Sequence, residues 1–221
     1  MKEAIKHFLA KYGLFSKVDL SRRMLQITNW ACHGCRSTAP PPIKRMVLAS
    51  YIKDYGLKHF VETGTHLGDT LADIAHDTSI LALSIELDAA LYNAAVRRFA
   101  GWSNVTLLHG DSGVLMPVVV KGLMSPTLFW LDGHYSGGTT AKSEIETPVS
   151  AELQAIFRSP VQGHVILIDD VRCFDGTHDY PHLDELLAII RTDGRYAIEV
   201  STDILRLTPK QAKTTVCYQG G

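Results

Sequence analysis

Short apolar runs alternate with longer amphipathic segments over residues 56–208 of this 221-residue chain. The apolar runs end in glycine or polar residues, which is typical of buried β-strands. We predict strands at residues 59–62, 80–86, 105–109, 127–132, 164–169, 196–200 and 204–207. We predict helices at about residues 69–77, 88–99, 112–121, 147–157 and 182–192.

This alternation predicts an α/β fold in which helices cover both faces of a parallel sheet. Each crossover connection is expected to be right-handed. In such folds, ligands bind beyond the carboxyl ends of the strands, near the point at which the strand order reverses. The residues that follow each strand are therefore the first candidates for a functional site.

The first 55 residues have a different pattern. Residues 3–12 place apolar side chains at helical spacing and are predicted to form a short amphipathic helix, whereas residues 13–40 carry only weak signals. Ala39 is followed by three prolines, which predicts an extended linker before a helix at residues 43–55. We therefore divide the chain into an N-terminal helical extension with its linker, residues 1–42, and a main domain, residues 43–221.

A C-x-x-C motif, C-H-G-C, lies in the N-terminal extension at Cys32 and Cys35. Zinc sites use such pairs because two thiolates on one turn bind the same ion, but one pair supplies only two of four ligands. Reduced thiols on a partly packed segment are the favoured interpretation. Zinc binding and a redox role stay open as alternatives.

The composition is that of an ordinary globular protein, with 46% apolar and 20% charged residues. The formal charge is 22 − 23 = −1, which gives no general attraction to nucleic acid or to an anionic membrane. No apolar run approaches the ~20 residues that span a bilayer, and the N-terminus lacks an uninterrupted signal-peptide core. We expect a cytoplasmic protein without nucleic-acid or membrane partners.

The first strand ends in E-T-G-T-H-L-G-D-T, which places Glu62 just before the glycines Gly64 and Gly68. Dinucleotide-binding turns instead read G-x-G-x-x-G and point a helix N-terminus at pyrophosphate. A carboxylate before the turn would repel pyrophosphate. The turn therefore suits a ligand with positive charge or with hydrogen-bond donors.

Acidic residues also follow the next two strands. Glu86 lies 22 residues beyond Gly64, at the position where α/β folds hold ribose hydroxyls, although a strand-end carboxylate also suits capping of the next helix. Asp111 follows the third strand. It is equally suited to accept a hydrogen bond from an adenine amino group and to cap the helix that begins at Ser112.

In these features residues 56–208 resemble the class I methyltransferases that use S-adenosylmethionine (SAM). The resemblance implies a Rossmann-like, doubly wound, mostly parallel seven-stranded sheet with an antiparallel terminal strand. It also implies that the glycine turn faces the methionine part of SAM, that the second-strand acid holds ribose, and that the third-strand aspartate lies near adenine. The implied cofactor-binding residues are Glu62, Thr63, Gly64, Gly68, Thr70, Glu86, Asp111 and Ser112.

Carboxylates follow the fourth and fifth strands as well. Asp132 follows the fourth strand in the sequence F-W-L-D-G-H, and Asp169 and Asp170 follow the fifth strand in I-L-I-D-D. Neighbouring strands lie ~4.8 Å apart, so these carboxylates can converge. Clustered carboxylates repel one another unless a cation or proton intervenes, and oxygen ligands favour Mg²⁺, with Mn²⁺ or Ca²⁺ as alternatives. Helix capping and loop hydrogen bonding without a metal are the competing interpretation.

This second set resembles the metal-dependent sugar O-methyltransferases of the macrocin O-methyltransferase type, whose motifs are L-D-G-D and D-D. The resemblance implies that Asp132, Asp169 and Asp170 are metal ligands and that Asp132 takes part in catalysis. It places the general base at the residue after the glycine, which is His134 here instead of Asp. Neutral imidazole is a competent base near neutral pH, although His134 is also suited to bind the metal or the substrate.

We therefore predict methyl transfer from SAM to a hydroxyl group of a sugar, a glycan or another small molecule, with His134 as the candidate base. A nucleotide-dependent oxidoreductase and a non-catalytic cofactor-binding module are the alternatives. The long polar loops at residues 137–140 and 174–181 are expected to cover or select the acceptor. The first 40 residues are expected to form part of a lid or a homodimer contact.

Overall fold

The computed structural model describes residues 14–36, 38–132, 148–177 and 180–210, with side chains described from residue 20 onward. The chain separates into two compact units, Met1–Val47 and Leu48–Gly221. The division falls within helix α3 (Pro41–Asp54), which leads into the first strand of the larger unit.

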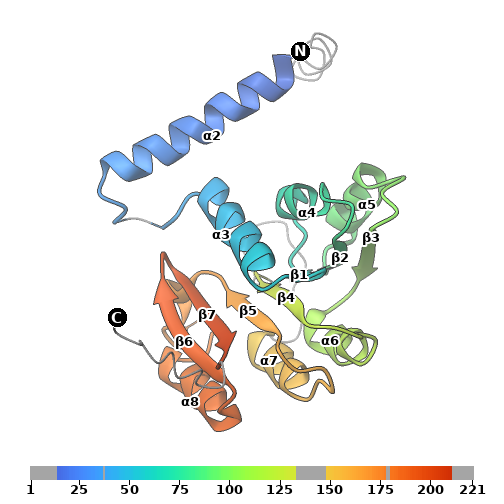
Figure 1. Cartoon of the computed structure of the whole chain (residues 1–221), viewed down its shortest axis with the longest axis vertical. Coiled ribbons are helices and arrows are strands. Elements are labelled where there is room, and N and C mark those ends of the chain that lie inside the picture. The colour runs from blue at the N-terminus through green and yellow to red at the C-terminus, as the bar shows by residue number, and fades with distance from the viewer. Residues whose placement is uncertain (1–13, 37, 133–147, 178–179, 211–221) are drawn as a thin grey trace, which may run out of the picture. The chain divides into compact units, whose positions relative to one another are not determined.

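The larger unit contains a seven-stranded sheet (Figure 1). Its strands are β1 (His59–Thr63), β2 (Leu81–Glu86), β3 (Val105–His109), β4 (Thr127–Leu131), β5 (Val165–Ile168), β6 (Tyr196–Ser201) and β7 (Ile204–Pro209). They follow the order β3-β2-β1-β4-β5-β7-β6 in space. Strand β7 runs antiparallel to both of its neighbours, and the other pairings are parallel. The predicted mostly parallel sheet with an antiparallel terminal strand is therefore confirmed.

Helices cover both faces of this sheet, with α4 and α5 on one side and α6, α7 and α8 on the other (Figure 1). Their bounds are α4 (Asp69–Ala75), α5 (Ala89–Arg98), α6 (Ser112–Lys121), α7 (Val149–Phe157) and α8 (Leu183–Asp193), and a 3₁₀ turn, η1 (Val171–Cys173), follows β5. A hydrophobic core fills the space between the sheet and the second group of helices, where Phe129, Leu153 and Ile166 are fully buried. Burial of such side chains supplies most of the driving force for this arrangement.

The strand order reverses between β1 and β4, which are neighbours in the sheet. Their register places Thr63 beside Leu131. The next residues of the two strands, Gly64 and Asp132, therefore leave the sheet at neighbouring positions. In doubly wound sheets this reversal creates the crevice in which ligands bind.

The N-terminal segment contains one helix that was not predicted, and one expectation for it was wrong. Helix α2 (Leu14–Cys32) occupies a stretch in which the sequence signals were too weak to predict an element. Helix α3 begins at Pro41, so Pro41 and Pro42 do not form an extended linker. Proline is tolerated in the first turn of a helix because the N–H groups there have no partner within the helix. The helix predicted at residues 3–12 lies outside the described residues.

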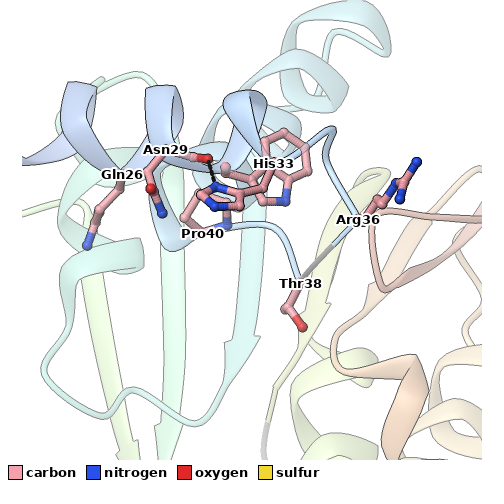
Figure 2. A pocket seen from close by; sticks show the side chains of 7 residues that line it. Gln26, Asn29, His33, Arg36, Thr38 and Pro40 are labelled. Carbon is pink, nitrogen blue, oxygen red and sulfur yellow. Dashed lines mark hydrogen bonds between the residues drawn. The ribbon is translucent and has the colours of Figure 1, made fainter.

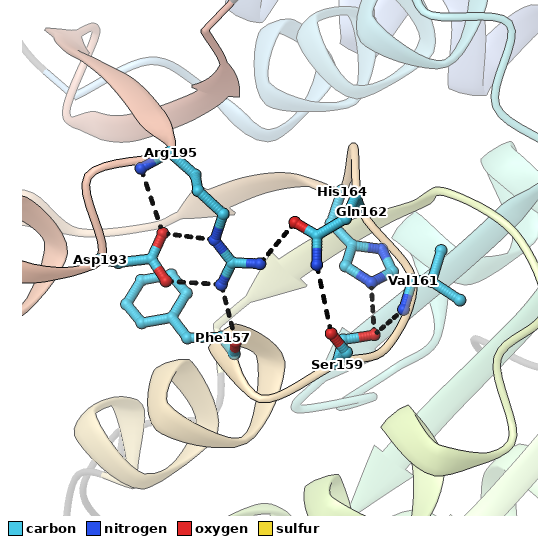
Figure 3. A network of polar contacts seen from close by, with 7 residues as sticks. All are labelled: Phe157, Ser159, Val161, Gln162, His164, Asp193 and Arg195. Atoms are coloured by element: carbon cyan, nitrogen blue, oxygen red, sulfur yellow. Dashed lines mark hydrogen bonds and ion pairs between the residues drawn. The ribbon is translucent and has the colours of Figure 1, made fainter.

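Polar contacts join the segments that precede the strands, at the edge of the sheet opposite to the crevice (Figure 3). Nδ1 of His164 accepts a hydrogen bond of 3.1 Å from the amide of Thr127, and its Nε2 lies 2.9 Å from the Ser159 hydroxyl oxygen. Nearby, Arg195 forms an ion pair with Asp193. Burial, together with the positive charge of Arg195, lowers the pKa of His164 to about 4. The ring is therefore neutral at physiological pH.

This network predicts a loss of stability in mild acid. The unfolded chain binds a proton at His164 near the ordinary pKa of 6.5, whereas the folded chain resists protonation down to about pH 4. The stabilisation by the neutral ring is fully present above pH 6.5 and is lost as the pH falls from 6.5 to about 4. We expect His164 to account for a loss of about 1–3 kcal/mol in unfolding free energy between pH 7 and pH 4.5.

Urea unfolding at both pH values, on the wild type and on His164→Gln, measures this effect. The stability difference between the two proteins should shrink at the lower pH, because glutamine does not titrate. An equal difference at both pH values would show that His164 is not responsible.

Candidate active site

The turn after β1 begins at Gly64, which has a left-handed conformation with φ of 80°. Its amide donates a hydrogen bond of 2.9 Å to the carbonyl oxygen of Ile85 on β2, which extends the contact between the two strands. A side chain at this φ value would strain the backbone. The start of the turn therefore requires glycine for backbone reasons.

Gly68, the second glycine of the turn, precedes α4 with φ of 76°. A Cβ atom added there would lie 2.8 Å from a ring carbon of Phe99, at the end of α5. Real Cβ atoms essentially never approach carbon atoms that closely, so a side chain at Gly68 would require the Phe99 ring to move. The glycine spacing that suggested a cofactor turn therefore also has an origin in helix packing.

Glu62 is buried at the end of β1. Its Oε1 accepts a hydrogen bond of 2.8 Å from Ser84 Oγ, which in turn lies 2.6 Å from Thr65 Oγ1. Burial raises the pKa of Glu62 to about 8; the charges of Asp132 and Glu86 also raise it, and the Ser84 bond opposes them. At pH 7 this group is therefore mostly protonated, although the sequence suggested a charged carboxylate.

Glu86 is buried at the end of β2. Its Oε2 accepts a hydrogen bond of 2.8 Å from the amide of His66, and its Oε1 accepts one of 2.9 Å from the amide of Asp88. The first contact holds the turn after β1, and the second holds the turn before α5, whose N-cap is Asp88. The residue predicted to bind ribose therefore also organises the two turns around it.

Asp111 caps α6, since its Oδ1 accepts a hydrogen bond of 2.8 Å from the amide of Gly113. The capping interpretation is therefore confirmed, and the contact with adenine stays a prediction. Ser112 is buried at the start of α6, and Thr70 is half-buried in the first turn of α4. The predicted cofactor-binding residues thus all lie at the carboxyl ends of β1 and β2 or in the segments that follow β1 and β3.

Asp132, Asp169 and Asp170 converge at the same edge of the sheet. Each offers one carboxylate oxygen, and these three oxygens lie within 4.8 Å of one another. Ligand oxygens on opposite sides of a Mg²⁺ or Ca²⁺ ion are about 4–5 Å apart, given bonds of ~2.0–2.6 Å. The trio therefore fits a hard divalent cation in both spacing and donor chemistry. Among the residues that the structure describes, it is the only group of three or more possible ligands found so close together.

Asp170 is held by contacts on two sides. It adopts φ of 55°, which is uncommon for a residue other than glycine, and its amide donates a hydrogen bond of 2.8 Å to Asp169 Oδ1. Arg172 binds Asp170 Oδ1 at 2.8 Å and also contacts Asp203, in the turn between β6 and β7. Arg172 therefore offsets part of the negative charge of the trio. This clamp could not be predicted from the sequence, because Arg172 and Asp203 are 31 positions apart.

Tyr180 lies close to the same carboxylates and was not singled out from the sequence. Burial raises the pKa of its hydroxyl, and the negative charges of Asp170 and Asp132 also raise it. Its ring meets Phe174 edge-on, with 5.3 Å between the ring centroids. An aromatic side chain therefore lies next to the carboxylate trio.

His134 lies outside the described residues, as does the loop at residues 137–140. The assignment of His134 as the base therefore rests on its place in the sequence, two residues after Asp132. Residues 178 and 179 of the second polar loop also lie outside the described residues.

The predicted cofactor site and the carboxylate trio adjoin each other. The charge of Asp132 helps to raise the pKa of Glu62, which requires the two groups to be close. The register of β1 and β4 independently brings Gly64 and Asp132 to neighbouring positions. A ligand on the turn after β1 would therefore lie beside a second ligand held near the trio.

The N-terminal unit has a separate hollow of about 650 Å³ (Figure 2). Its lining includes Trp30 and His33, and Nδ1 of His33 lies 2.7 Å from the carbonyl oxygen of Asn29. Nearby in the sequence, Cys32 and Cys35 are exposed and do not form a disulfide. Within the described ranges, these cysteines do not belong to any set of three metal ligands.

No family profile and no curated protein matches this sequence, but solved structures do. The O-methyltransferase from Bacillus cereus in complex with S-adenosylhomocysteine (SAH) aligns with a TM-score of 0.59 and 14% identity, over 85% of this chain and 90% of that one. TomG of Streptomyces achromogenes, an O-methyltransferase involved in tomaymycin synthesis and in complex with SAM, aligns with a TM-score of 0.54 and 15% identity, over 85% and 88%. SAH-bound PaMTH1 of Podospora anserina aligns with a TM-score of 0.58 and 14% identity, over 84% and 87%.

The chain therefore has the fold of class I SAM-dependent O-methyltransferases, which confirms the resemblance at the level of architecture. At 14–15% identity, the comparison carries no information about the substrate of this chain. None of the helices in the described ranges is both long and apolar enough to cross a membrane.

Proposed function

We propose that this protein is a SAM-dependent methyltransferase that methylates a hydroxyl group of a sugar, a glycan or another small molecule, assisted by a divalent cation. The observation that supports it best is the meeting of two groups at one edge of the sheet. The turn after β1, with Glu62 beneath it, lies next to the carboxylates of Asp132, Asp169 and Asp170. Methyl transfer to oxygen requires a cofactor site that adjoins the acceptor site, because donor and acceptor must meet in line.

Each residue group has a distinct role in this proposal. The turn at Gly64 holds the methionine part of SAM, Glu86 binds the ribose hydroxyls, and Asp111 lies by the adenine. A divalent cation bound to the trio would lower the pKa of the acceptor hydroxyl. His134 would take the proton from that hydroxyl. Alignment of oxygen, methyl carbon and sulfur contributes most of the rate.

The two alternatives receive no support. The O-methyltransferases of similar fold were solved with SAM or SAH, and the E-x-G-x-x-x-G spacing departs from the dinucleotide pattern. A non-catalytic module has no need for three converging carboxylates, which repel one another without a cation or proton between them.

Formation of SAH from SAM in the presence of hydroxylated acceptors tests the proposal. Sugars, glycans and small phenols are offered separately, with Mg²⁺ or with EDTA. We expect turnover with at least one acceptor class and its loss in EDTA. Turnover that resists EDTA would contradict the role of the metal alone, whereas a lack of SAM binding would contradict the whole proposal.

The buried Glu62 predicts that SAM binding releases a proton. The methionine part of SAM carries positive charges on the sulfonium and the amino group and one negative charge on its carboxylate. A positive group placed close to Glu62 lowers the pKa of its carboxyl from about 8. Most of the free protein holds this proton at pH 7, so we expect release of about one proton per SAM bound there. Above pH 9 the release should vanish, because the free protein has already lost the proton.

Titration calorimetry at pH 7 in phosphate and in Tris measures the released protons from the difference in binding heat. The Glu62→Gln variant is the control, since it has no proton to lose at this position. Equal proton release by the variant and the wild type would assign the proton to another group.

A further inference from the structure

Glu152 is a buried acidic residue with no place in the mechanism above. It lies in the first turn of α7, and 1% of its surface is exposed. The hydroxyl groups of Thr63 and Ser112 donate hydrogen bonds to its carboxylate. Its Oε1 has no hydrogen-bond partner in the parts of the chain that the structure describes. Acidic side chains are rarely buried this completely, because loss of hydration is costly unless partners or a function compensate for it.

The packing of α6 and α7 brings Glu152 to this position. The two helices lie against each other on one face of the sheet (Figure 1). A Cβ atom added at Gly113, near the start of α6, would lie 3.3 Å from the Cβ of Pro148 and 3.5 Å from the Cβ of Ala151. The N-terminal ends of the two helices are therefore in close contact, and Glu152 extends from this contact to the end of β1.

We propose that Glu152 is a positioning residue of the cofactor site. It holds the side chain of Thr63, which precedes Gly64, and that of Ser112, which follows Asp111. Through these two hydroxyl groups it fixes the backbone that presents both segments to SAM. The inference rests on the proposed function, because these segments are the predicted contacts of the methionine and adenine parts.

The charge of Glu152 determines how it holds its two partners. A carboxylate accepts hydrogen bonds from both hydroxyl groups. A protonated carboxyl group is itself a donor, so it also needs an acceptor for its own proton. Burial raises the pKa of Glu152 to about 7; the two hydroxyl groups oppose this shift and Asp111 adds to it. Asp111 is the ionisable group that faces Glu152 from the start of α6, and β1 presents the neutral Thr63. Glu62 precedes Thr63 in the strand and points to the opposite face of the sheet.

Cofactor affinity as a function of pH tests this role. Calorimetry with SAM at pH 6.0 and 8.5 compares the wild type with Glu152→Gln, in which a neutral side chain of the same shape replaces the acid. We expect the variant to bind SAM about fivefold more weakly than the wild type at pH 8.5. At pH 6.0 the wild-type acid is itself neutral, so the two affinities should agree. Glu199→Gln, at an exposed position on β6, is the matched control and should follow the wild type at both pH values.

Ser112→Ala provides a second test if Glu152→Gln does not fold, because it removes one partner and leaves the acid in place. We expect it to weaken SAM binding at pH 8.5 by a similar factor, and to weaken it less at pH 6.0. A ratio of variant to wild-type affinity that is the same at both pH values, for either variant, would overturn the positioning role alone. A wild type that does not bind SAM at either pH would overturn the proposed function, and this role with it.

Discussion

Gly64→Arg is expected to abolish SAM binding in a protein that stays folded. The arginine side chain would enter the turn where the proposal places the methionine part of SAM, and its positive charge would repel the sulfonium. We expect the affinity to fall at least about 100-fold, which is about 3 kcal/mol of binding free energy. The φ value of 80° should cost a further 1–2 kcal/mol of stability, roughly the strain of a left-handed conformation.

Gly56→Arg is the matched control for this variant. Gly56 also has a positive φ, of 61°, and no atom lies within 4 Å of an added Cβ. It precedes β1 and therefore lies at the edge of the sheet opposite to the crevice. The control should lose a similar amount of stability in urea unfolding and keep its affinity for SAM in calorimetry. If both variants bind SAM equally well, the turn at Gly64 is not the cofactor site.

Asp169→Asn is expected to have the second largest effect, on catalysis and not on SAM binding. The substitution removes one charge from the trio and keeps an oxygen that can accept the hydrogen bond from the amide of Asp170. Loss of the divalent cation should slow methyl transfer about a thousandfold, which corresponds to several kcal/mol of transition-state stabilisation. The metal-free variant should be as stable as the metal-free wild type or slightly more stable, since one repulsive charge is gone.

Three measurements check this prediction: Mn²⁺ binding by electron paramagnetic resonance, the rate of SAH formation, and urea unfolding in EDTA. Asp77→Asn is the control, because Asp77 precedes β2 at the other edge of the sheet and bonds only locally, through Ser79, in the described structure. Tight Mn²⁺ binding and undiminished turnover in Asp169→Asn would show that the trio does not hold a catalytic metal.

The order of strands and helices could be predicted because the apolar pattern is strong in the main domain. Strand β3 and helix α6 have the expected bounds, since Gly110 and Asp111 separate a short apolar run from a helical one and Asp111 provides the cap. The pattern gave no comparable signal for α2, where Leu20, Met24 and Leu25 are exposed and do not define one buried face. At α3, the prolines marked the beginning of a helix and not an interruption.

The approach of the site residues to one edge could also be predicted, because a parallel sheet brings the carboxyl ends of its strands together. The converging trio of aspartates follows from this rule. The sequence did not reveal the state of each group, because the protonation of Glu62 depends on its burial and on Asp132, which comes from another strand. It also did not reveal Glu152, since a glutamate in an amphipathic helix is normally read as a surface residue.

We propose that the crevice between β1 and β4 binds SAM. Calorimetric titration of the wild-type protein with SAM, and separately with NADH, tests it most directly. We expect one SAM site per chain and no binding of NADH. Binding of NADH without binding of SAM, or no binding of either, would contradict it.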